Sequence, residues 1–280
     1  MKQSAVLQGQ TGNRYNIRAL DRAFRILTLL SDGRIRSLQQ LSGETHLSAS
    51  TTFRQLATLA SYGFVQRDEQ TSQYALGSAC LELARAYYEG NDLRRLALPE
   101  LERLRNDTRE TVHLAILDRM EIVYIEKIQG LHPIGLMGSR VGGRAPAYCT
   151  GVGKVLLAHK APAVIRQNFI RRKLRRFTDE TITSYAALVS ELASIQRQGY
   201  ALDHGEHELQ VRCVATPIFD MKGEVVAALS ISGPADRMEP IERNRDMIEN
   251  AKRTARNISV MLGSGLPAVT VKPSQAPRST

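Results

Sequence analysis

The spacing of apolar residues predicts three short helices near the N-terminus. The first has apolar positions at helical spacing and ends at Asp32-Gly33; these positions are Leu20, Ala23, Phe24, Leu27 and Leu30. Ser37 and Gln40 form a capping-box pattern at the start of the second helix, and Ser48 caps the third. The third helix is expected to bury one face, made of Phe53, Leu56, Ala57 and Ala60.

A hairpin pattern follows directly. Residues 64–67 and 72–76 read as two strands on either side of a polar turn at 68–71. Three helices followed by a two-stranded hairpin predict a winged helix-turn-helix. The face of the third helix opposite its apolar stripe carries polar side chains that hydrogen-bond to base edges and phosphates: Ser50, Thr51, Arg54 and Gln55.

From Thr111 the pattern changes from helical spacing to alternation. It predicts strands at 111–117, 121–128, 136–137, 211–219 and 225–232, and helices at 150–160, 185–198 and 241–262. Strands flanked by helices in this order are typical of a small-molecule sensor domain. The predicted fold class is therefore α+β, with two domains.

The same patterns divide the chain. We expect a disordered N-terminal arm at 1–15, a winged helix-turn-helix at 16–77, a helical linker at 78–105, an effector-binding domain at 106–263 and a disordered tail at 264–280. The tail is rich in proline and shows no periodicity. A helical linker transmits orientation between domains better than a flexible one.

Composition and charge narrow the function. The chain is 42% hydrophobic and 24% charged, without a membrane-length apolar run or a signal-peptide pattern. Three separated cysteines suggest neither a disulfide framework nor a metal motif, so a reducing cytoplasm is expected. The formal net charge is +10, and residues 1–67 hold nine Lys or Arg against three Asp or Glu. This excess favours contact with phosphate near the helix-turn-helix.

A second basic run lies at 171–176. A solvated helix face explains it better than a nucleic-acid contact, although the second interpretation stays open.

Other chemistries fit less well. The 203–208 segment holds two histidines and three acids, but dense polar loops are usually solvated, and no metal is expected. The GVGK sequence at 151–154 lacks the residues of a phosphate loop, so helix packing and anion capping explain it better than a nucleotide. The histidines are scattered, and no catalytic arrangement is evident. We therefore predict neither an enzyme nor a cofactor.

Several motifs resemble a known family. They include ALDRAFRIL at 19–27, LSASTTFR at 47–54, ETVHL at 110–114, GVGKVLLA at 151–158, RCVATP at 212–217 and LSISGP at 229–234. In this order and spacing they resemble the IclR-type bacterial transcriptional regulators, from about 16 to 263. The resemblance implies a C-terminal GAF-like effector domain and homodimers or homotetramers on near-palindromic operators in double-stranded DNA. It also implies small organic-acid effectors from carbon catabolism.

The resemblance places the effector pocket on seven residues: Met137, Gly151, Val152, Asp203, Cys213, Ser230 and Ser232. Their chemistry suits a small anion. Gly151 and Val152 open a helix that Thr150 is expected to cap, so backbone N–H groups there can receive a carboxylate. Ser230 and Ser232 alternate on one strand and share a face, although that face could instead point to solvent.

For the DNA interface we expect base or groove contacts from the third helix and phosphate contacts around it. The predicted residues are Arg36, Ser37, Ser48, Ser50, Thr51, Arg54, Gln55 and Arg67. The predicted function is a sequence-specific DNA-binding regulator, a repressor of a carbon-catabolic pathway, controlled by an organic acid. The alternative is a sensor or interaction module without specific DNA binding.

Overall fold

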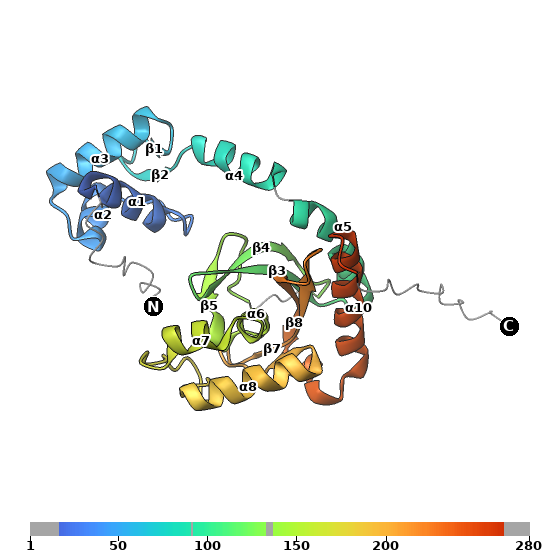
Figure 1. Ribbon diagram of the computed structural model, residues 1–280. Coiled ribbons are helices and arrows are strands. Elements are labelled where there is room, and N and C mark those ends of the chain that lie inside the picture. Colours follow the sequence, from blue (N-terminus) through green and yellow to red (C-terminus); the bar gives the residue numbers. More distant parts are fainter. Residues whose placement is uncertain (1–16, 91, 133–136, 266–280) are drawn as a thin grey trace. The chain divides into compact units, whose positions relative to one another are not determined.

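The computed structural model describes residues 17–90, 92–132 and 137–265 and divides the chain into two compact units, residues 1–90 and 91–280 (Figure 1). The described residues do not include the predicted N-terminal arm or the predicted tail from 266 onward. They also leave out one residue of the predicted strand at 136–137. The other residue of that strand, Met137, is irregular.

The N-terminal unit has the predicted order of elements. It contains α1 (Arg18–Leu30), α2 (Leu38–Thr45), α3 (Ala49–Ser61), β1 (Val65–Arg67), β2 (Tyr74–Leu76) and α4 (Ala79–Glu89). The two strands are antiparallel and pair Gln66 with Ala75. Arg36 bridges to Tyr74 through two backbone hydrogen bonds of 3.0 and 2.8 Å, which fastens the wing to the segment before α2.

The predicted caps are confirmed. Ser37 Oγ accepts the Gln40 backbone N–H at 3.2 Å, and Gln40 Oε1 accepts the Ser37 N–H at 2.8 Å. His46 ends α2 in the left-handed region with φ of 55°, which turns the chain toward α3. Ser48 Oγ then accepts the Thr51 N–H at 3.2 Å. These local hydrogen bonds satisfy backbone donors that each helix start leaves free.

The predicted buried face of α3 is wrong in three of its four residues. Leu56 is fully buried, but Phe53 is 50% exposed and the two alanines are exposed. The buried stripe consists of Thr52, Leu56 and Leu59. Apolar residues on this helix fit two overlapping faces, and a threonine occupies the buried one because its hydroxyl donates to the Ser48 carbonyl at 3.1 Å.

In α1, too, the buried face differs from the predicted apolar face. Ile26 and Leu30 enter the core with Leu41, Leu56 and Val65, whereas Leu20 and Phe24 are 52% and 63% exposed.

The C-terminal unit is built on one six-stranded sheet in the order β5-β4-β3-β8-β7-β6, in which every neighbouring pair is antiparallel. Its strands are β3 (Thr111–Asp118), β4 (Glu121–Ile128), β5 (Arg144–Pro146), β6 (Ala201–Asp203), β7 (Val211–Phe219) and β8 (Val225–Pro234).

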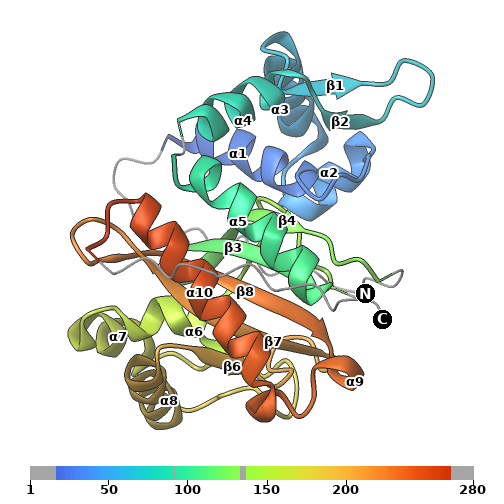
Figure 2. The same ribbon diagram turned by 90° about the vertical axis from the view of Figure 1, so that its right-hand side faces the viewer.

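Helices cover both faces of this sheet (Figure 2). They are α5 (Asp92–Thr108) and α10 (Arg245–Met261) on one face, and α6 (Gly151–Ala158), α7 (Pro162–Phe169) and α8 (Tyr185–Gln198) on the other. Short turns of helix are η1 (Ala147–Cys149), α9 (Ala235–Met238) and η2 (Ile241–Arg243). Because both faces are covered, central strands such as β7 are buried almost continuously from Val214 to Ile218.

The predicted linker spans two helices that differ in packing. α4 is the last element of the N-terminal unit, while α5 packs on the sheet of the C-terminal unit through Ala97, Leu101 and Leu104.

The basic run at 171–176 follows α7 as turn and irregular chain, so the predicted helix face is wrong. Its five cationic side chains are exposed and Leu174 is buried. Among the described residues, no helix is long and apolar enough to span a membrane.

The corrected face of α3 leads to a stability prediction. Replacing Leu56 with Ala removes a fully buried side chain, and we expect the free energy of unfolding of the N-terminal unit to fall by about 2–5 kcal/mol. Phe53→Ala is the matched control, because a half-exposed ring leaves little cavity, and its cost is expected to stay below about 1 kcal/mol. Urea unfolding of both variants measures the difference; equal destabilisation would contradict the assignment of the faces.

Candidate DNA interface and effector cavity

The predicted base-contacting residues lie together in the N-terminal half of α3. Ser50 and Arg54 are exposed, and Thr51 and Gln55 are half-buried. Ser48 precedes them and its hydroxyl caps the helix while donating to Thr51 Oγ1 at 2.9 Å. The helix thus presents hydroxyl, guanidinium and amide groups outward, which is the chemistry of direct readout in the major groove.

Arg36 has a structural role that the sequence did not show. It is 7% exposed, and its guanidinium contacts both Asp32 oxygens at 2.8 and 2.7 Å and Glu44 at 3.3 Å. It also donates to the Leu29 carbonyl at 2.9 Å, tying the end of α1 to α2. The hydrogen bond from Arg36 holds the pKa of Asp32 well below its usual range. A contact between Arg36 and a DNA phosphate remains a prediction.

Arg67 lies on the wing. Its side chain is exposed, donates to Ser72 Oγ at 2.9 Å and lies 5.9 Å from the centre of the Tyr74 ring. Ser37, in contrast, is half-buried and occupied as the cap of α2.

The seven predicted effector residues line one cavity in the C-terminal unit. The space between these residues has a volume of about 430 Å³, which includes a part open to solvent. Its other lining residues are His113, Tyr124, Ser139, Thr150, His207, Glu208 and Val211. Residues far apart in the sequence therefore line one space, and their role in binding an effector stays a prediction.

The N-terminus of α6 reaches this cavity through Gly151 and Val152. A Cβ atom on Gly151 would lie 3.3 Å from Ala215 Cβ and 3.5 Å from Cys213 Cβ, so the helix start is pressed against β7. The predicted capping by the Thr150 side chain is wrong, because its hydroxyl lies 3.4 Å from the Pro146 carbonyl instead. The first-turn N–H groups are thereby left open to an anion.

Two serine hydroxyls and an imidazole, linked by short contacts, form another part of the cavity lining. Ser230 Oγ lies 3.1 Å from Ser232 Oγ, and both contact His113 Nδ1, at 3.4 and 3.3 Å. His113 Nε2 lies 2.8 Å from Ser139 Oγ. Burial, with a smaller effect of Lys127, lowers the pKa of His113 to about 3, so its ring is neutral. The solvent-face alternative for the serines is wrong, since both are buried.

Asp203 and Cys213 complete the site. Asp203 Oδ1 accepts the backbone N–H groups of Gly205 and Glu206 at 3.0 and 2.9 Å. Burial raises the pKa of the Cys213 thiol well above its ordinary value, and Asp203 adds to the effect. Cys213 is therefore a neutral wall of the cavity.

Apart from Thr150, which was expected only as a helix cap, the sequence missed six lining residues that the folded chain reveals. His113 is paired with Ser230 across β3 and β8. Because such pairs share one face of the sheet, knowing this register would have added His113 to the site. Tyr124, Ser139, His207, Glu208 and Val211 come from other strands and loops, and no local pattern assigned them to a cavity.

The side chains of the acidic loop at 203–208 do not converge on one point. Its members have partners on different elements: His204 faces Glu242 at 3.5 Å, Glu206 pairs with Lys154, and His207 packs against Phe177. Within the described residues, no group of three or more His, Cys, Asp or Glu side chains is placed to hold a metal ion.

Comparison with known proteins agrees with this architecture. Residues 19–69 match the IclR helix-turn-helix domain, and residues 85–260 match the bacterial transcriptional regulator IclR C-terminal domain. The HTH-type transcriptional regulator KdgR of Escherichia coli is 37% identical over 242 residues, covering 86% of this chain and 91% of the relative. The HTH-type transcriptional repressor AllR of Salmonella paratyphi A is 35% identical, covering 88% and 90%.

A solved structure shares the fold. It is an IclR homolog from Microbacterium hydrocarbonoxydans complexed with 4-hydroxybenzoate, with a TM-score of 0.76 and 29% identity over 87% of this chain and 98% of that one. With both domain models matched in order across most of the sequence, the chain belongs to the IclR family of DNA-binding bacterial transcriptional regulators.

Proposed function

We propose that this regulator represses genes of a carbon-catabolic pathway and that a small organic acid, bound in the C-terminal cavity, controls its affinity for DNA. The observation that carries the proposal is the convergence of all seven effector residues on one cavity. Two relatives add support, since one is a repressor and one binds a carboxylate. The protein would act in the cytoplasm, where its operators are.

The proposed operator is a near-palindrome in double-stranded DNA, bound by a homodimer or by a homotetramer that uses two such pairs. Ser50, Thr51, Arg54 and Gln55 of each copy would face base edges, while Ser37, Ser48, Arg36 and Arg67 would lie near phosphates. Two recognition helices must be about 34 Å apart, or a multiple of this, to bind consecutive major grooves. Operator affinity therefore depends steeply on their spacing.

The cavity favours an acid that also carries hydroxyl groups. Its described lining holds two carboxylates, Asp203 and Glu208, and neither Lys nor Arg. A carboxylate effector would thus be held by the first-turn N–H groups of α6 and by the serine hydroxyls, without a cation. Asp203 would accept a hydrogen bond from a hydroxyl of the ligand. Hydroxy acids, sugar acids and hydroxylated aromatic acids fit this pattern.

Control of DNA binding by this acid is a coupling between two sites. An effector that binds one arrangement of the paired chains more tightly shifts the population toward it, and the spacing of the recognition helices follows. Typical coupling energies of about 1–3 kcal/mol would change operator affinity by about 5- to 150-fold.

Arg54→Ala tests the DNA half of the proposal. Because alanine cannot donate hydrogen bonds to a base edge, specific operator binding should weaken by about 1–3 kcal/mol and become less selective at one base pair. Arg67→Ala is the comparison: removing a phosphate-binding cation from the wing should weaken binding to all sequences alike. Gel-shift titration at fixed salt measures both, and unchanged affinity and selectivity in Arg54→Ala would refute its role.

Replacing Ser230 and Ser232 with Ala together tests the effector half. Removal of two hydroxyls should weaken acid binding by about 1–3 kcal/mol, because each hydrogen bond contributes about 0.5–1.5 kcal/mol. Ser190→Ala, at an exposed position of α8, is the matched control and should bind as the unchanged chain does. Calorimetric titration with pyruvate, gluconate and 4-hydroxybenzoate provides the measurement. Equal affinities in all three proteins would place the acid elsewhere.

A further inference from the structure

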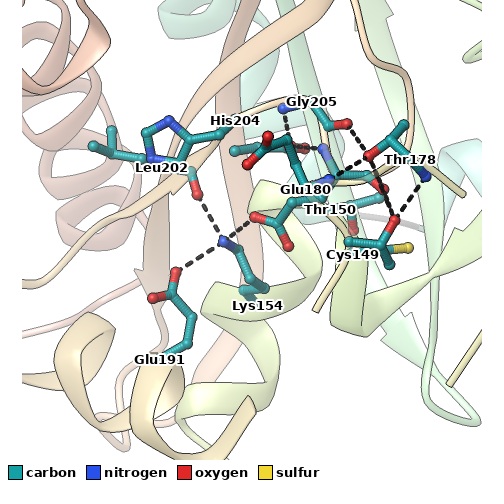
Figure 3. Close-up of polar contacts among 12 residues, drawn as sticks. Cys149, Thr150, Lys154, Thr178, Glu180, Glu191, Leu202, His204 and Gly205 are labelled. Atoms are coloured by element: carbon teal, nitrogen blue, oxygen red, sulfur yellow. Dashed lines mark hydrogen bonds and ion pairs between the residues drawn. The ribbon is translucent and has the colours of Figure 1, made fainter. Parts of the chain in front are cut away.

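A buried lysine lies directly behind the effector cavity. Lys154 is on α6, one turn after the glycine and valine that line the cavity, and it is 1% exposed. Its Nζ donates to the Leu202 carbonyl at 2.7 Å and to Glu191 Oε1 at 2.8 Å (Figure 3). It also pairs closely with Glu206. Helices α6 and α8, strand β6 and the loop after β6 therefore meet at one ammonium group.

The Lys154 contacts hold the loop that forms part of the cavity wall. Thr178 Oγ1 donates to the Gly205 carbonyl at 2.7 Å (Figure 3). Thr181 Oγ1 donates to the Glu206 carbonyl at 2.6 Å. On the cavity side, the backbone N–H of Glu206 binds the Asp203 carboxylate. The side chain of Glu206 thus faces Lys154 while its backbone orients a residue that faces the effector.

The charges around Lys154 do not balance. One ammonium group meets the carboxylates of Glu206, Asp203 and Glu191, while Cys149 and Cys213 face the same region as thiols whose pKa burial raises. Burial alone would lower the pKa of Lys154, but the carboxylates outweigh it and raise the pKa. Glu206 Oε2 is buried, and no described residue offers it a hydrogen bond. This oxygen is the natural site for a proton.

We propose that Lys154 and Glu206 position the 203–208 loop at the cavity wall and couple the binding of an anionic effector to the uptake of a proton at Glu206. The inference rests on the proposed function of the cavity. Protonated Glu206 leaves a less negative surrounding for an incoming carboxylate, so the anion and the proton favour each other.

The direction of the pH dependence follows from the charges. Burial raises the pKa of Glu206 to about 7, while Lys154 opposes the shift and Asp203 adds to it. As pH rises through this value, Glu206 becomes ionised and repels the effector. The pKa of His113, lowered to about 3, keeps this lining ring neutral over the range, and burial lowers the pKa of the other lining histidine, His207, as well. Effector affinity is therefore expected to fall as pH rises through neutrality.

The Glu206 contribution to the free energy of unfolding also falls as pH rises. The Glu206 carboxyl binds its proton more tightly in the folded chain than its ordinary value of 4.5 allows. Its contribution to stability is thus complete below about pH 4.5 and is lost as pH rises toward about 7.

Glu206→Gln tests the coupling, because the amide keeps the shape of the side chain and removes its titration. In the unchanged protein, acid binding should be about three- to tenfold weaker at about pH 8 than at about pH 6. In Glu206→Gln the affinity should be independent of pH. Glu180→Gln makes the same chemical change at an exposed position nearby and should keep the slope of the unchanged protein.

Calorimetry with pyruvate, gluconate and 4-hydroxybenzoate, in buffers that differ in ionisation enthalpy, measures both affinity and proton uptake. Proton uptake by the unchanged protein that Glu206→Gln lacks supports the proposal. Acid binding with the same pH slope in both proteins overturns the coupling and leaves the proposed function intact. Binding of no acid by the unchanged protein overturns the proposed function as well.

Lys154→Met tests the positioning role. Removal of the counter-ion leaves the carboxylates unpaired, so acid binding should weaken, and adding Glu206→Gln should restore part of it. Because the two residues are in contact, their effects on stability are not expected to be additive, and a purely structural role predicts that acid affinity falls only as far as folding stability falls. Thermal unfolding of the single and double variants identifies any variant that does not fold; the double variant, which removes both charges, still tests the coupling in that case.

Discussion

The close approach of α6 to its surroundings is the constraint on which the effector cavity depends. A Cβ atom on Gly153 would lie 2.3 Å from the Ala147 carbonyl oxygen and 2.5 Å from Thr150 Oγ1, so only glycine allows this packing. Gly151, the first residue of the helix, lies against β7 and β6. The first turn of α6 therefore meets the sheet at the cavity wall, and its N–H groups point to the place where an anion would bind.

This constraint explains why GVGK resembles a phosphate loop without containing its other residues. The glycines serve packing, and the lysine turns away from the cavity into a buried cluster of carboxylates. One short helix thus contributes a helix start that would favour an anion to the cavity lining, and a buried ammonium group to the carboxylate cluster beside it.

Local chemistry was predictable from the sequence, and long-range packing was not. Caps at Ser37 and Ser48 depend on residues three positions away, so their pattern is visible in the sequence. The orientation of α3 depends on α1 and α2, and periodicity alone placed Phe53 inside. The cavity was found through family motifs, whereas His113 required the β3–β8 register. Lys154 and Glu206, 52 residues apart, carried no sequence signal of their pairing.

The two units differ in the charges that they offer to their proposed ligands. The basic excess near the N-terminus suits a polyanion, whereas the described cavity lining offers the start of α6 and hydroxyl groups beside two acidic side chains. In the proposed function, a metabolite acid would be bound without a cation among the described lining residues, so its affinity would be sensitive to small changes in nearby charge.

The most direct test of this account is reciprocal coupling between operator and acid. Binding sites would be selected from a random pool of duplexes with the purified full chain, and the enriched site titrated at physiological salt with and without each acid. The account predicts an enriched palindromic site whose affinity one acid changes, and an acid affinity that the site changes by the same factor. Failure to enrich any sequence, or an enriched site whose affinity no acid alters, would contradict it.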